Sequence, residues 1–417
     1  MRTVDLLIIG GGSAGMAAAI QAKKEGIDDI LIVERDENLG GILNQCIHNG
    51  FGLTEFKEEL TGPEYLARFV AQVEELKIPY MTSSMVIDMT KDKLVTISNK
   101  EEGVIQVQAK AIVMATGCYE RSAGAIQVPG DRCSGILTAG TAQKYLNIHG
   151  YLCGKRIVIL GSGDIGLIMA RRLTLEGAQV ICVSELMPYS NGLNRNIAQC
   201  LNDFNIPLYL SRSVSKVIAK DGRLEKVILT AVDEKLQFIP GTDMEIECDT
   251  LILSVGLVPY ISLLNYIDCP ISSTKGAKVD EHLETMIDGI FSCGNCLHVH
   301  DVVDFVTDEG RLAGHSAAMY LRGELTSSNT IDVIAKDGIG YVLPQVINLS
   351  NKEDVTIKFR VRTPIKDVNL IIESGNTQIV KRFNSVLIPS EMAMVKISYN
   401  KLEGISENIV VRLENRE

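Results

Sequence analysis

The sequence predicts an α/β protein with two dinucleotide-binding units and a smaller antiparallel β domain towards its C-terminal end. Three observations support this fold class. A short apolar strand followed by G-x-G-x-x-G and a helical stretch occurs twice, at 4–15 and at 156–166. Strand-like and helix-like stretches alternate up to about residue 322, as in sheets flanked by helices. After about residue 330, apolar and polar residues alternate instead, which favours antiparallel strands.

The repeated motif has the spacing of a phosphate-binding turn between a strand and a helix. The first glycine allows a tight turn, the second lets a pyrophosphate approach the backbone, and the third lets the helix pack closely on the sheet. The pyrophosphate then sits at the helix N-terminus, where unpaired N–H groups and the helix dipole favour negative charge. The two turns contain Gly10, Gly12, Ser13, Ala14 and Gly15 in the first copy, and Gly161, Gly163, Asp164, Ile165 and Gly166 in the second.

An acidic residue follows each turn at the same distance. Glu34 and Glu185 each lie 24 residues after the first glycine of their turn, at the end of a second apolar strand. Another glycine, Gly26 or Gly177, lies 16 residues after that first glycine. A carboxylate there accepts hydrogen bonds from a ribose 2′-hydroxyl and repels a 2′-phosphate, so Glu185 favours NAD over NADP. Because strand, helix, glycine and acid agree in both copies, we favour two binding sites over one site and a relic turn. A chain that holds two dinucleotides usually passes electrons between them.

Composition excludes several other classes of protein. The 417 residues carry a net charge of −11 and no basic cluster, which argues against a nucleic-acid partner. We expect no membrane span, since no apolar run approaches the ~18–20 residues required. The N-terminus enters a strand directly without a secretory signal, so we expect a cytoplasmic protein. The 10 cysteines are scattered and lack zinc or iron–sulfur spacing.

Other elements follow in order along the chain. The patterns predict helices at 13–24, 63–76, 139–146 and about 302–321, an antiparallel ribbon at 84–108, and buried strands at 111–117, 249–256 and 288–295, with a glycine-rich loop at 40–52. In the last part of the chain, Val355, Ile357, Phe359 and Val361 alternate with polar residues, and strand-like runs follow at 368–372, 378–381, 393–398 and 408–413. These predict a small β-sandwich with one wet face, which we interpret as a docking or interface module.

Taken together, these landmarks resemble the pyridine nucleotide–disulfide oxidoreductase superfamily of two-dinucleotide flavoproteins. The ordered set comprises both glycine turns with their acids, Ala115-Thr116-Gly117, Val255-Gly256, and the segment 289–295. The resemblance implies that the first unit holds FAD and that the second, inserted into it, holds NAD(P)H. The implied domains are 1–122 with 252–325 for FAD, 123–251 for NAD(P), and 330–417 for the β domain. It also implies cofactor contacts from Arg35, Gly41, Gly256, Gly294, Asn295, Asp301 and Val302.

The connector suggests a closer relationship. Residues 135–143 and 154–156 are similar to the flavin subunits of amine, opine and sarcosine oxidases, and closer still to a bacterial flavoprotein that forms part of a glycerol-3-phosphate dehydrogenase. The chain departs from disulfide reductases because Leu43 and His48 stand where a C-x4-C pair would lie. The acid that holds the ribityl chain of FAD in the family is Asn295 here, which can still hydrogen-bond a hydroxyl but is neutral.

Histidines beside the implied flavin site are candidates for chemistry. His298 and His300 could shuttle protons or balance the charge of reduced flavin, or could simply bind a phosphate or carbonyl. The helix after them would aim its N–H groups at the flavin, with Asp301 as its N-cap. We expect no metal, because no third well-spaced ligand is evident. Asp304, Asp308 and Glu309 are expected to form a solvated face.

Cysteines offer a second set of candidates. Cys46 and His48 lie where the family keeps its redox cysteines, so they could be a proton-transfer pair or a thiol that contacts flavin; an ordinary loop is equally consistent with the sequence. Cys293 and Cys296 are the only C-x-x-C pair, and they fall in the loop implied to contact FAD. A dithiol relay to a disulfide substrate is therefore a minor alternative.

The leading functional hypothesis is an FAD-dependent oxidoreductase that exchanges electrons between NAD(H) and a partner dehydrogenase subunit. That partner would act on a small metabolite such as glycerol 3-phosphate or an amine, and the chain would be part of an oligomer. One alternative is a stand-alone NADH oxidase or small-acceptor reductase. Another, of a different class, is a non-catalytic assembly subunit that keeps a structural dinucleotide. The sequence does not identify the final substrate or the direction of electron flow.

Overall fold

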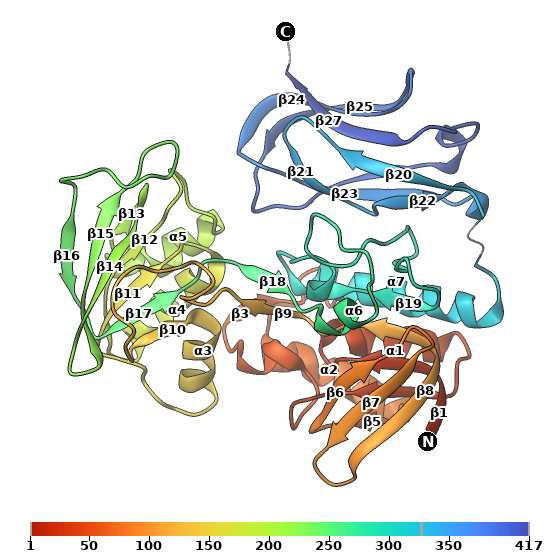
Figure 1. Cartoon of the computed structure of the whole chain (residues 1–417), viewed down its shortest axis with the longest axis horizontal. Coiled ribbons are helices and arrows are strands. Elements are labelled where there is room, and N and C mark those ends of the chain that lie inside the picture. Colours follow the sequence, from red (N-terminus) through yellow and green to blue (C-terminus); the bar gives the residue numbers. More distant parts are fainter. Residues whose placement is uncertain (1, 326–327, 416–417) are drawn as a thin grey trace. The chain divides into compact units, whose positions relative to one another are not determined.

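A computed structural model of the chain describes residues 2–325 and 328–415, which form two compact units (Figure 1). The first unit comprises residues up to 44, 49–118 and 259 onwards, and the second comprises 45–48 and 119–258. The second unit is thus inserted into the first. Strands β9 (Cys118–Glu120) and β18 (Leu257–Pro259) pair where the chain crosses between the units.

A mixed sheet forms the base of the first unit. Its order is β5-β2-β1-β8-β7-β6, with β19 also paired to β8. Strands β5, β2, β1, β19 and the second half of β8 run parallel, whereas β6, β7 and the first half of β8 form the expected antiparallel ribbon. The strands are β1 (Arg2–Ile9), β2 (Ile30–Val33), β5 (Tyr80–Met81), β6 (Ser84–Met89), β7 (Leu94–Asn99), β8 (Gly103–Met114) and β19 (Ile290–Ser292).

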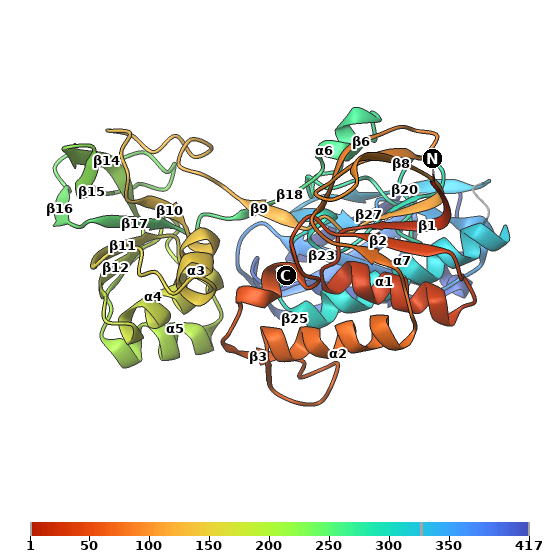
Figure 2. The ribbon, with the colours of Figure 1, turned by 90° about the horizontal axis from the view of Figure 1, so that it is seen from below.

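Helices α1 (Ser13–Lys24), α2 (Gly62–Glu75) and α7 (Val303–Arg322) lie along one face of this sheet (Figure 2). Helix α1 contacts both α2 and α7. The contact with α7 is close because a Cβ at Gly310 would lie 2.3 Å from the carbonyl oxygen of Ala14. Shorter elements are η1 (Gly41–Gln45), β3 (Asn49–Phe51), β4 (Leu60–Thr61), α6 (Ser262–Tyr266) and η3 (Gly294–Cys296).

The second unit repeats the parallel arrangement. Its main sheet has the order β10-β17-β11-β12-β13, and every neighbouring pair is parallel. Strand β17 lies wholly within this sheet, although the predicted boundary at 251/252 divides it. The elements are β10 (Ile136–Thr138), α3 (Ala139–Asn147), β11 (Arg156–Leu160), α4 (Asp164–Leu175), β12 (Gln179–Ser184), α5 (Asn194–Cys200), η2 (Asn202–Phe204), β13 (Leu208–Tyr209) and β17 (Thr250–Leu253), with an antiparallel sheet of β14 (Arg212–Lys220), β15 (Arg223–Ala231) and β16 (Met244–Glu247).

The last part of the chain is the predicted β-sandwich (Figure 1). One sheet has the order β22-β20-β27-β24-β25 and the other β21-β23-β26. Inward-facing Val355, Ile357, Phe359 and Val361 belong to its buried core, as their alternation predicts. All pairs are antiparallel except β20 with β27. The elements are β20 (Thr330–Ala335), β21 (Ile339–Leu343), β22 (Val346–Asn348), η4 (Leu349–Asn351), β23 (Val355–Val361), β24 (Ile365–Ser374), β25 (Thr377–Leu387), β26 (Ala393–Ile397), η5 (Tyr399–Lys401) and β27 (Ile409–Asn415).

The structure explains why a glycine lies 16 residues after the first glycine of each turn. Gly26 and Gly177 both have φ of +90°, and each follows the helix that starts at the glycine turn. A left-handed residue just past the last helical turn ends a helix without steric cost only when it is glycine. The fixed spacing therefore reflects two helices of equal length, 12 residues each. Within residues 2–325 and 328–415, no helix is both long enough and apolar enough to cross a membrane.

Candidate flavin and nucleotide sites

The first glycine turn lies at the carboxyl edge of the parallel strands. Ile9 at the end of β1 aligns with Met114 of β8, and Met114 aligns in turn with Ser292 of β19. The segments that follow these three strands therefore leave the sheet side by side. Ligands of open α/β sheets bind at this edge.

Close packing explains the glycines of the first turn. A Cβ at Gly10 would lie 2.3 Å from the carbonyl oxygen of Ala115, which ties the turn to the strand end next to it. A Cβ at Gly12, in contrast, would meet no atom within 4 Å. That open space lies at the N-cap of α1, and Gly41 passes close to the same turn, since a Cβ at Gly41 would be 3.5 Å from Gly12 Cα. The arrangement is a cradle for an anionic group at a helix N-terminus.

The second turn has the same construction. A Cβ at Gly161 would lie 2.0 Å from the carbonyl oxygen of Ser254, which follows β17 as Ala115 follows β8. At Gly163, the N-cap of α4, the nearest atom to a Cβ would be Ser254 Oγ at 3.6 Å. The carboxylate of Asp164 accepts hydrogen bonds from Leu193 N–H and from the Asn196 side chain. The side chain of Asp164 thus holds the 193–196 segment. Only the backbone N–H of Asp164, at the start of α4, is left to contact a phosphate.

Glu34 and Glu185 occupy matching positions. Glu34 Oε2 accepts from Gly11 N–H at 2.7 Å, and Glu185 Oε2 accepts from Ser162 N–H at 2.9 Å. The other carboxylate oxygen of each accepts from the backbone two residues further on. Both side chains are buried, and a carboxylate oxygen can accept two hydrogen bonds, so each keeps capacity for a hydroxyl. Both predicted acids are therefore held against their own glycine turns.

The remaining predicted contact residues surround the two turns. Arg35 is exposed and its guanidinium lies 5.9 Å from the centre of the Tyr260 ring. Thr116 Oγ1 donates to the carbonyl of Tyr260, and Tyr260 N–H donates to the carbonyl of Gly117. In the second unit, Arg121 N–H donates to the carbonyl of Gly256. Ser13 and Ala14 are buried in the first turn of α1, and Ile165 packs on the core beneath α4.

The cysteine candidates lie in surroundings that suppress thiolate chemistry. Cys46 is half-buried beside Gln143, and burial raises the pKa of its thiol to about 12, so it stays protonated at neutral pH. His48 lies in the same short segment of the second unit and is partly exposed. Cys293 and Cys296 are fully buried free thiols, and burial raises both pKa values. These observations argue against a thiolate role for Cys46 and against a C-x-x-C relay that a disulfide substrate could reach.

The histidines belong to a buried polar cluster, which we call the Glu309 cluster: His298, His300, Glu309 and Lys358. Glu309 Oε1 contacts His298 Nε2 at 3.0 Å and the Lys358 ammonium at 2.8 Å. Its Oε2 accepts from Gly294 N–H at 2.9 Å and lies 3.3 Å from His300 Nε2. Burial alone would raise the pKa of Glu309, but the Lys358 ammonium and the histidines lower it well below its ordinary value. The carboxylate is thus ionised and paired.

This cluster adjoins the first glycine turn. A Cβ at Gly294 would lie 2.9 Å from the Cβ of Ala14, in the first turn of α1. Asn295 holds the same loop, because its Oδ1 accepts from the backbone N–H of His300 at 3.0 Å. The side chain expected to contact the ribityl chain is therefore engaged with His300 through its oxygen, while its Nδ2 faces Cys118 Sγ at 3.7 Å.

Two expectations about the segment 301–309 are wrong. Asp301 is not the N-cap of α7, since that position is Val302 and has no side-chain cap. The Asp301 carboxylate instead pairs with the Arg360 guanidinium and accepts from Met392 N–H. Of the acids expected on a solvated face, Glu309 is buried in its cluster, and Asp304 is buried and accepts from Thr54 N–H at 2.7 Å.

The supposed wet face of the β domain is also partly buried. Lys358 and Arg360 project from β23 towards the loop before α7, and their side chains are only 19% and 13% exposed. Arg360 also donates to the carbonyl of Val299. We missed these residues because an alternating strand looks the same in sequence whether its polar face meets water or another polar surface. The excess of basic residues on that face was the one available signal.

The Glu309 cluster contains residue types that bind metals, but it also contains a positive charge that disfavours a metal cation. His298, His300 and Glu309 bring ligand atoms within 4.8 Å of one another. However, the Lys358 ammonium already supplies the positive charge against Glu309, and it would repel a metal cation. We therefore describe the group as an ion pair with two histidines, and the expectation of no metal stays a prediction.

The buried histidine predicts an acid-labile fold. Burial lowers the pKa of His298 from about 6.5 to about 4 although Glu309 attracts its proton. Below pH 6.5 the unfolded chain binds a proton that the folded chain refuses, so stability falls between pH 6.5 and 4 by about 3 kcal/mol. Urea unfolding at pH 7.5, 5.5 and 4.5 measures this loss. His298→Asn should flatten the profile, whereas His149→Gln, at an exposed site, should not. Equal profiles for His298→Asn and the parent chain would contradict the assignment.

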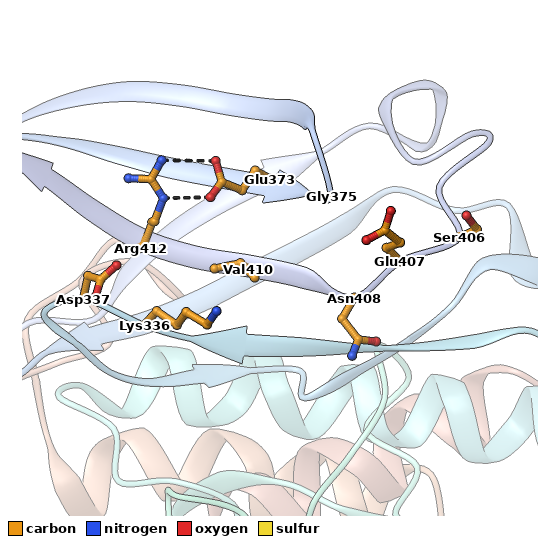
Figure 3. A pocket seen from close by; sticks show the side chains of 9 residues that line it. All are labelled: Lys336, Asp337, Glu373, Gly375, Ser406, Glu407, Asn408, Val410 and Arg412. Carbon is orange, nitrogen blue, oxygen red and sulfur yellow. Dashed lines mark hydrogen bonds and ion pairs between the residues drawn. The ribbon is translucent and has the colours of Figure 1, made fainter.

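A separate hollow on the β domain does not resemble a cofactor site. In Figure 3 the Arg412 guanidinium faces the Glu373 carboxylate, to which it is paired. Arg412 also forms an ion pair with Glu414. The positive charge of Arg412 in this hollow is thus already neutralised by two carboxylates. The hollow is lined by Lys336, Asp337, Glu373, Gly375, Ser406, Glu407, Asn408, Val410 and Arg412.

The residues present fit FAD in the first unit. The open space over Gly12, the N-terminus of α1 and the anchored Glu34 provide what a pyrophosphate and a ribose require. The second unit provides the same three features for a pyridine nucleotide at Gly163, α4 and Glu185.

Comparisons with known proteins agree with this geometry. The family described as pyridine nucleotide-disulphide oxidoreductase matches residues 4–320. An NADH oxidase of Methanocaldococcus jannaschii is 26% identical over 349 residues, which is 79% of this chain and 70% of that protein. An opine oxidase subunit of Agrobacterium tumefaciens is 26% identical over 283 residues, 64% of this chain and 54% of that protein. The thioredoxin reductase structure from T. acidophilum has a TM-score of 0.61 at 21% identity, covering 76% of this chain and 98% of that one, and shows the fold.

The match to the family extends over both glycine turns, their acids and the loop before α7. Members of this family typically bind FAD and NAD(P). The chain therefore belongs to the pyridine nucleotide–disulphide oxidoreductase family, as an oxidoreductase that works with a flavin and a pyridine nucleotide.

Proposed function

We propose that the chain is an FAD-dependent oxidoreductase that moves electrons between NAD(H) and a partner dehydrogenase subunit. The observation that carries the proposal is the matched pair of cradles, each with an acid anchored on its own glycine turn. FAD at the first cradle supplies the two-electron chemistry. The N–H groups of α1 bind its pyrophosphate and Glu34 receives its ribose hydroxyls. The N-terminal dipole of α7, at the same sheet edge, favours added negative charge there.

The choice of NAD(H) rests on Glu185. Its carboxylate is held by Ser162 and Met187 at the end of β12, where a ribose 2′-substituent would lie. A 2′-phosphate would meet a buried negative charge, whereas a hydroxyl would donate to it. We therefore expect NADH to be preferred over NADPH.

The partner subunit is supported by the thiol chemistry of the chain and by its relatives. A disulfide reductase passes electrons through a reachable dithiol, but the only C-x-x-C pair here is buried. The connector resembles that of amine, opine and sarcosine oxidases and of a flavoprotein that forms part of a glycerol-3-phosphate dehydrogenase, and the opine oxidase relative is itself named as one subunit of its enzyme. The electrons are accordingly proposed to pass to or from a second chain that acts on a small metabolite, a polyol phosphate or an amine. Cytoplasmic location, oligomerisation and the lack of a nucleic-acid partner remain predictions.

A stand-alone NADH oxidase is the second candidate, because the M. jannaschii relative bears that name. Anaerobic titration of the purified chain separates these functions. The proposal expects a bound flavin that NADH bleaches at a much lower concentration than NADPH, with slow reoxidation by oxygen. Fast turnover with oxygen or quinones would favour the oxidase. A flavin that neither NADH nor dithionite reduces would favour a non-catalytic assembly subunit.

The partner is tested separately by co-purification of the native chain from its own cells. The expected result is a stable complex with a dehydrogenase subunit. Its metabolite should then reduce the flavin of the complex but not that of the isolated chain. Reduction of the isolated chain by the metabolite would contradict the division of labour between two subunits.

A further inference from the structure

The Glu309 cluster contains a histidine whose hydrogen bonds are arranged for one additional proton. Asn295 fixes the orientation of this histidine. The backbone N–H of His300 donates to Asn295 Oδ1 at 3.0 Å, so that atom must be the amide oxygen. The same oxygen lies 3.3 Å from His300 Nδ1. Because an amide oxygen only accepts, Nδ1 carries the hydrogen.

The other ring nitrogen then faces an acceptor. In a neutral imidazole with its hydrogen on Nδ1, Nε2 carries a lone pair. Nε2 of His300 lies 3.3 Å from Glu309 Oε2 and, among the described residues, has no hydrogen-bond partner although it is buried. Two lone pairs therefore face each other in a buried site, and a proton on Nε2 would turn this contact into a charge-assisted hydrogen bond.

His298 plays a different part in the same cluster. Its Nε2 lies 3.0 Å from Glu309 Oε1, which a neutral imidazole can satisfy by donating its single hydrogen. The centre of its ring lies 4.0 Å from that of His300, with the two planes tilted by 34°, so two charged rings would repel each other. His298 thus keeps one hydrogen bond and remains neutral, whereas His300 is the ring with a place for another proton.

The charges around His300 balance when its ring is neutral. The Lys358 ammonium is paired with Glu309, and the Arg360 guanidinium is paired with Asp301. One added negative charge close by would therefore be offset by one added proton. Two titratable groups contact His300 directly, namely Glu309 on α7 and His298 in its own loop. The charged and titratable groups around these are Asp301 in the same loop, Lys358 and Arg360 on β23, Tyr341 on β21, and Cys118 beside Asn295.

We propose that His300 Nε2 binds a proton when the flavin is reduced. Lys358, supplied by the β domain, positions the Glu309 carboxylate to accept the hydrogen bond from that protonated nitrogen. The proposal rests on the proposed function and deepens it. Hydride transfer from NADH leaves NAD⁺ and brings two electrons and one proton to the flavin site. The second proton comes from solvent and forms the N–H bond at His300 Nε2. The β domain is accordingly part of the redox centre, in addition to any docking role.

Proton uptake during reduction tests this inference without turnover. The full chain with bound FAD is reduced anaerobically with dithionite at several pH values around 8, and the flavin potential is measured at each. Each proton that accompanies two electrons shifts the potential by about 30 mV per pH unit. The parent chain is expected to show about 60 mV per pH unit, and His300→Gln about 30 mV, because glutamine can donate to Glu309 but cannot titrate.

His298→Gln is the matched control and should keep the slope of the parent chain, because His298 holds one hydrogen in both states. His300→Asn provides a second variant that cannot titrate if His300→Gln binds no flavin. Equal slopes for the parent chain and the His300 variants would overturn the inference, as would loss of the second proton in His298→Gln alone. Failure of the proposed function is distinguishable, since it would appear as a parent chain without flavin or with flavin that NADH does not reduce.

Discussion

Replacing Gly12 with valine is expected to give a folded protein without flavin. The protein has room for the new side chain, since no atom lies within 4 Å of a Cβ built there. The branched side chain would instead occupy the space at the N-cap of α1 that the pyrophosphate requires. A loss of about 3 kcal/mol of binding corresponds to roughly a 100-fold weaker affinity, and we expect at least that. Flavin absorbance and fluorescence after reconstitution measure the loss, and circular dichroism verifies the fold.

The equivalent change in the second unit should separate the two cofactors. Gly163→Val is expected to keep the flavin but to abolish its reduction by NADH, while dithionite still bleaches it. Gly124→Val is the matched control, because Gly124 is exposed, lies outside both turns and has no atom nearer than 3.8 Å to a Cβ. Loss of flavin in Gly163→Val, or normal NADH reduction in it, would contradict the assignment of the second cradle.

Breaking the buried pair of Glu309 and Lys358 is expected to cost about 3–5 kcal/mol of unfolding free energy, because either change leaves an uncompensated charge in the interior. The Glu309 side chain is fully buried and that of Lys358 is 19% exposed. Lys358→Met and Glu309→Gln should each unfold at a markedly lower urea concentration. The double variant Glu309→Leu/Lys358→Met should recover much of the loss, since no charge then remains unpaired.

A control for this cycle is the solvent-exposed pair of Lys396 and Asp354 in the β domain, which are 3.1 Å apart. Its removal should change the urea midpoint far less, because solvent screens exposed ion pairs. The Glu309 variants should also bind FAD more weakly, because Glu309 holds the Gly294 N–H against the first turn of α1. Additive losses in the double variant would show that the two side chains do not act as a pair.

The sequence was most informative where function depends on short spacing. Both turns, their acids and the two 12-residue helices follow from residues within about 25 positions of one another, and backbone sterics leave few alternatives for such patterns. The same holds for the ribbon at 84–108 and for the alternating strands of the β domain. Contacts between residues separated by long stretches of chain could not be predicted from the sequence in this way. Asp301 looked like a helix cap, yet its partner Arg360 lies 59 residues further on.

By itself, the sequence determined that this chain has two matching glycine turns and which acids are hydrogen-bonded to them, because those contacts are local. Only the tertiary structure decided what surrounds the first glycine turn. Glu309 meets Lys358 across 49 residues, and the two histidines meet Glu309 because α7 packs over the loop before it. A buried acid and a solvated acid have the same sequence signature, and they differ only in which charges the folded chain brings to them.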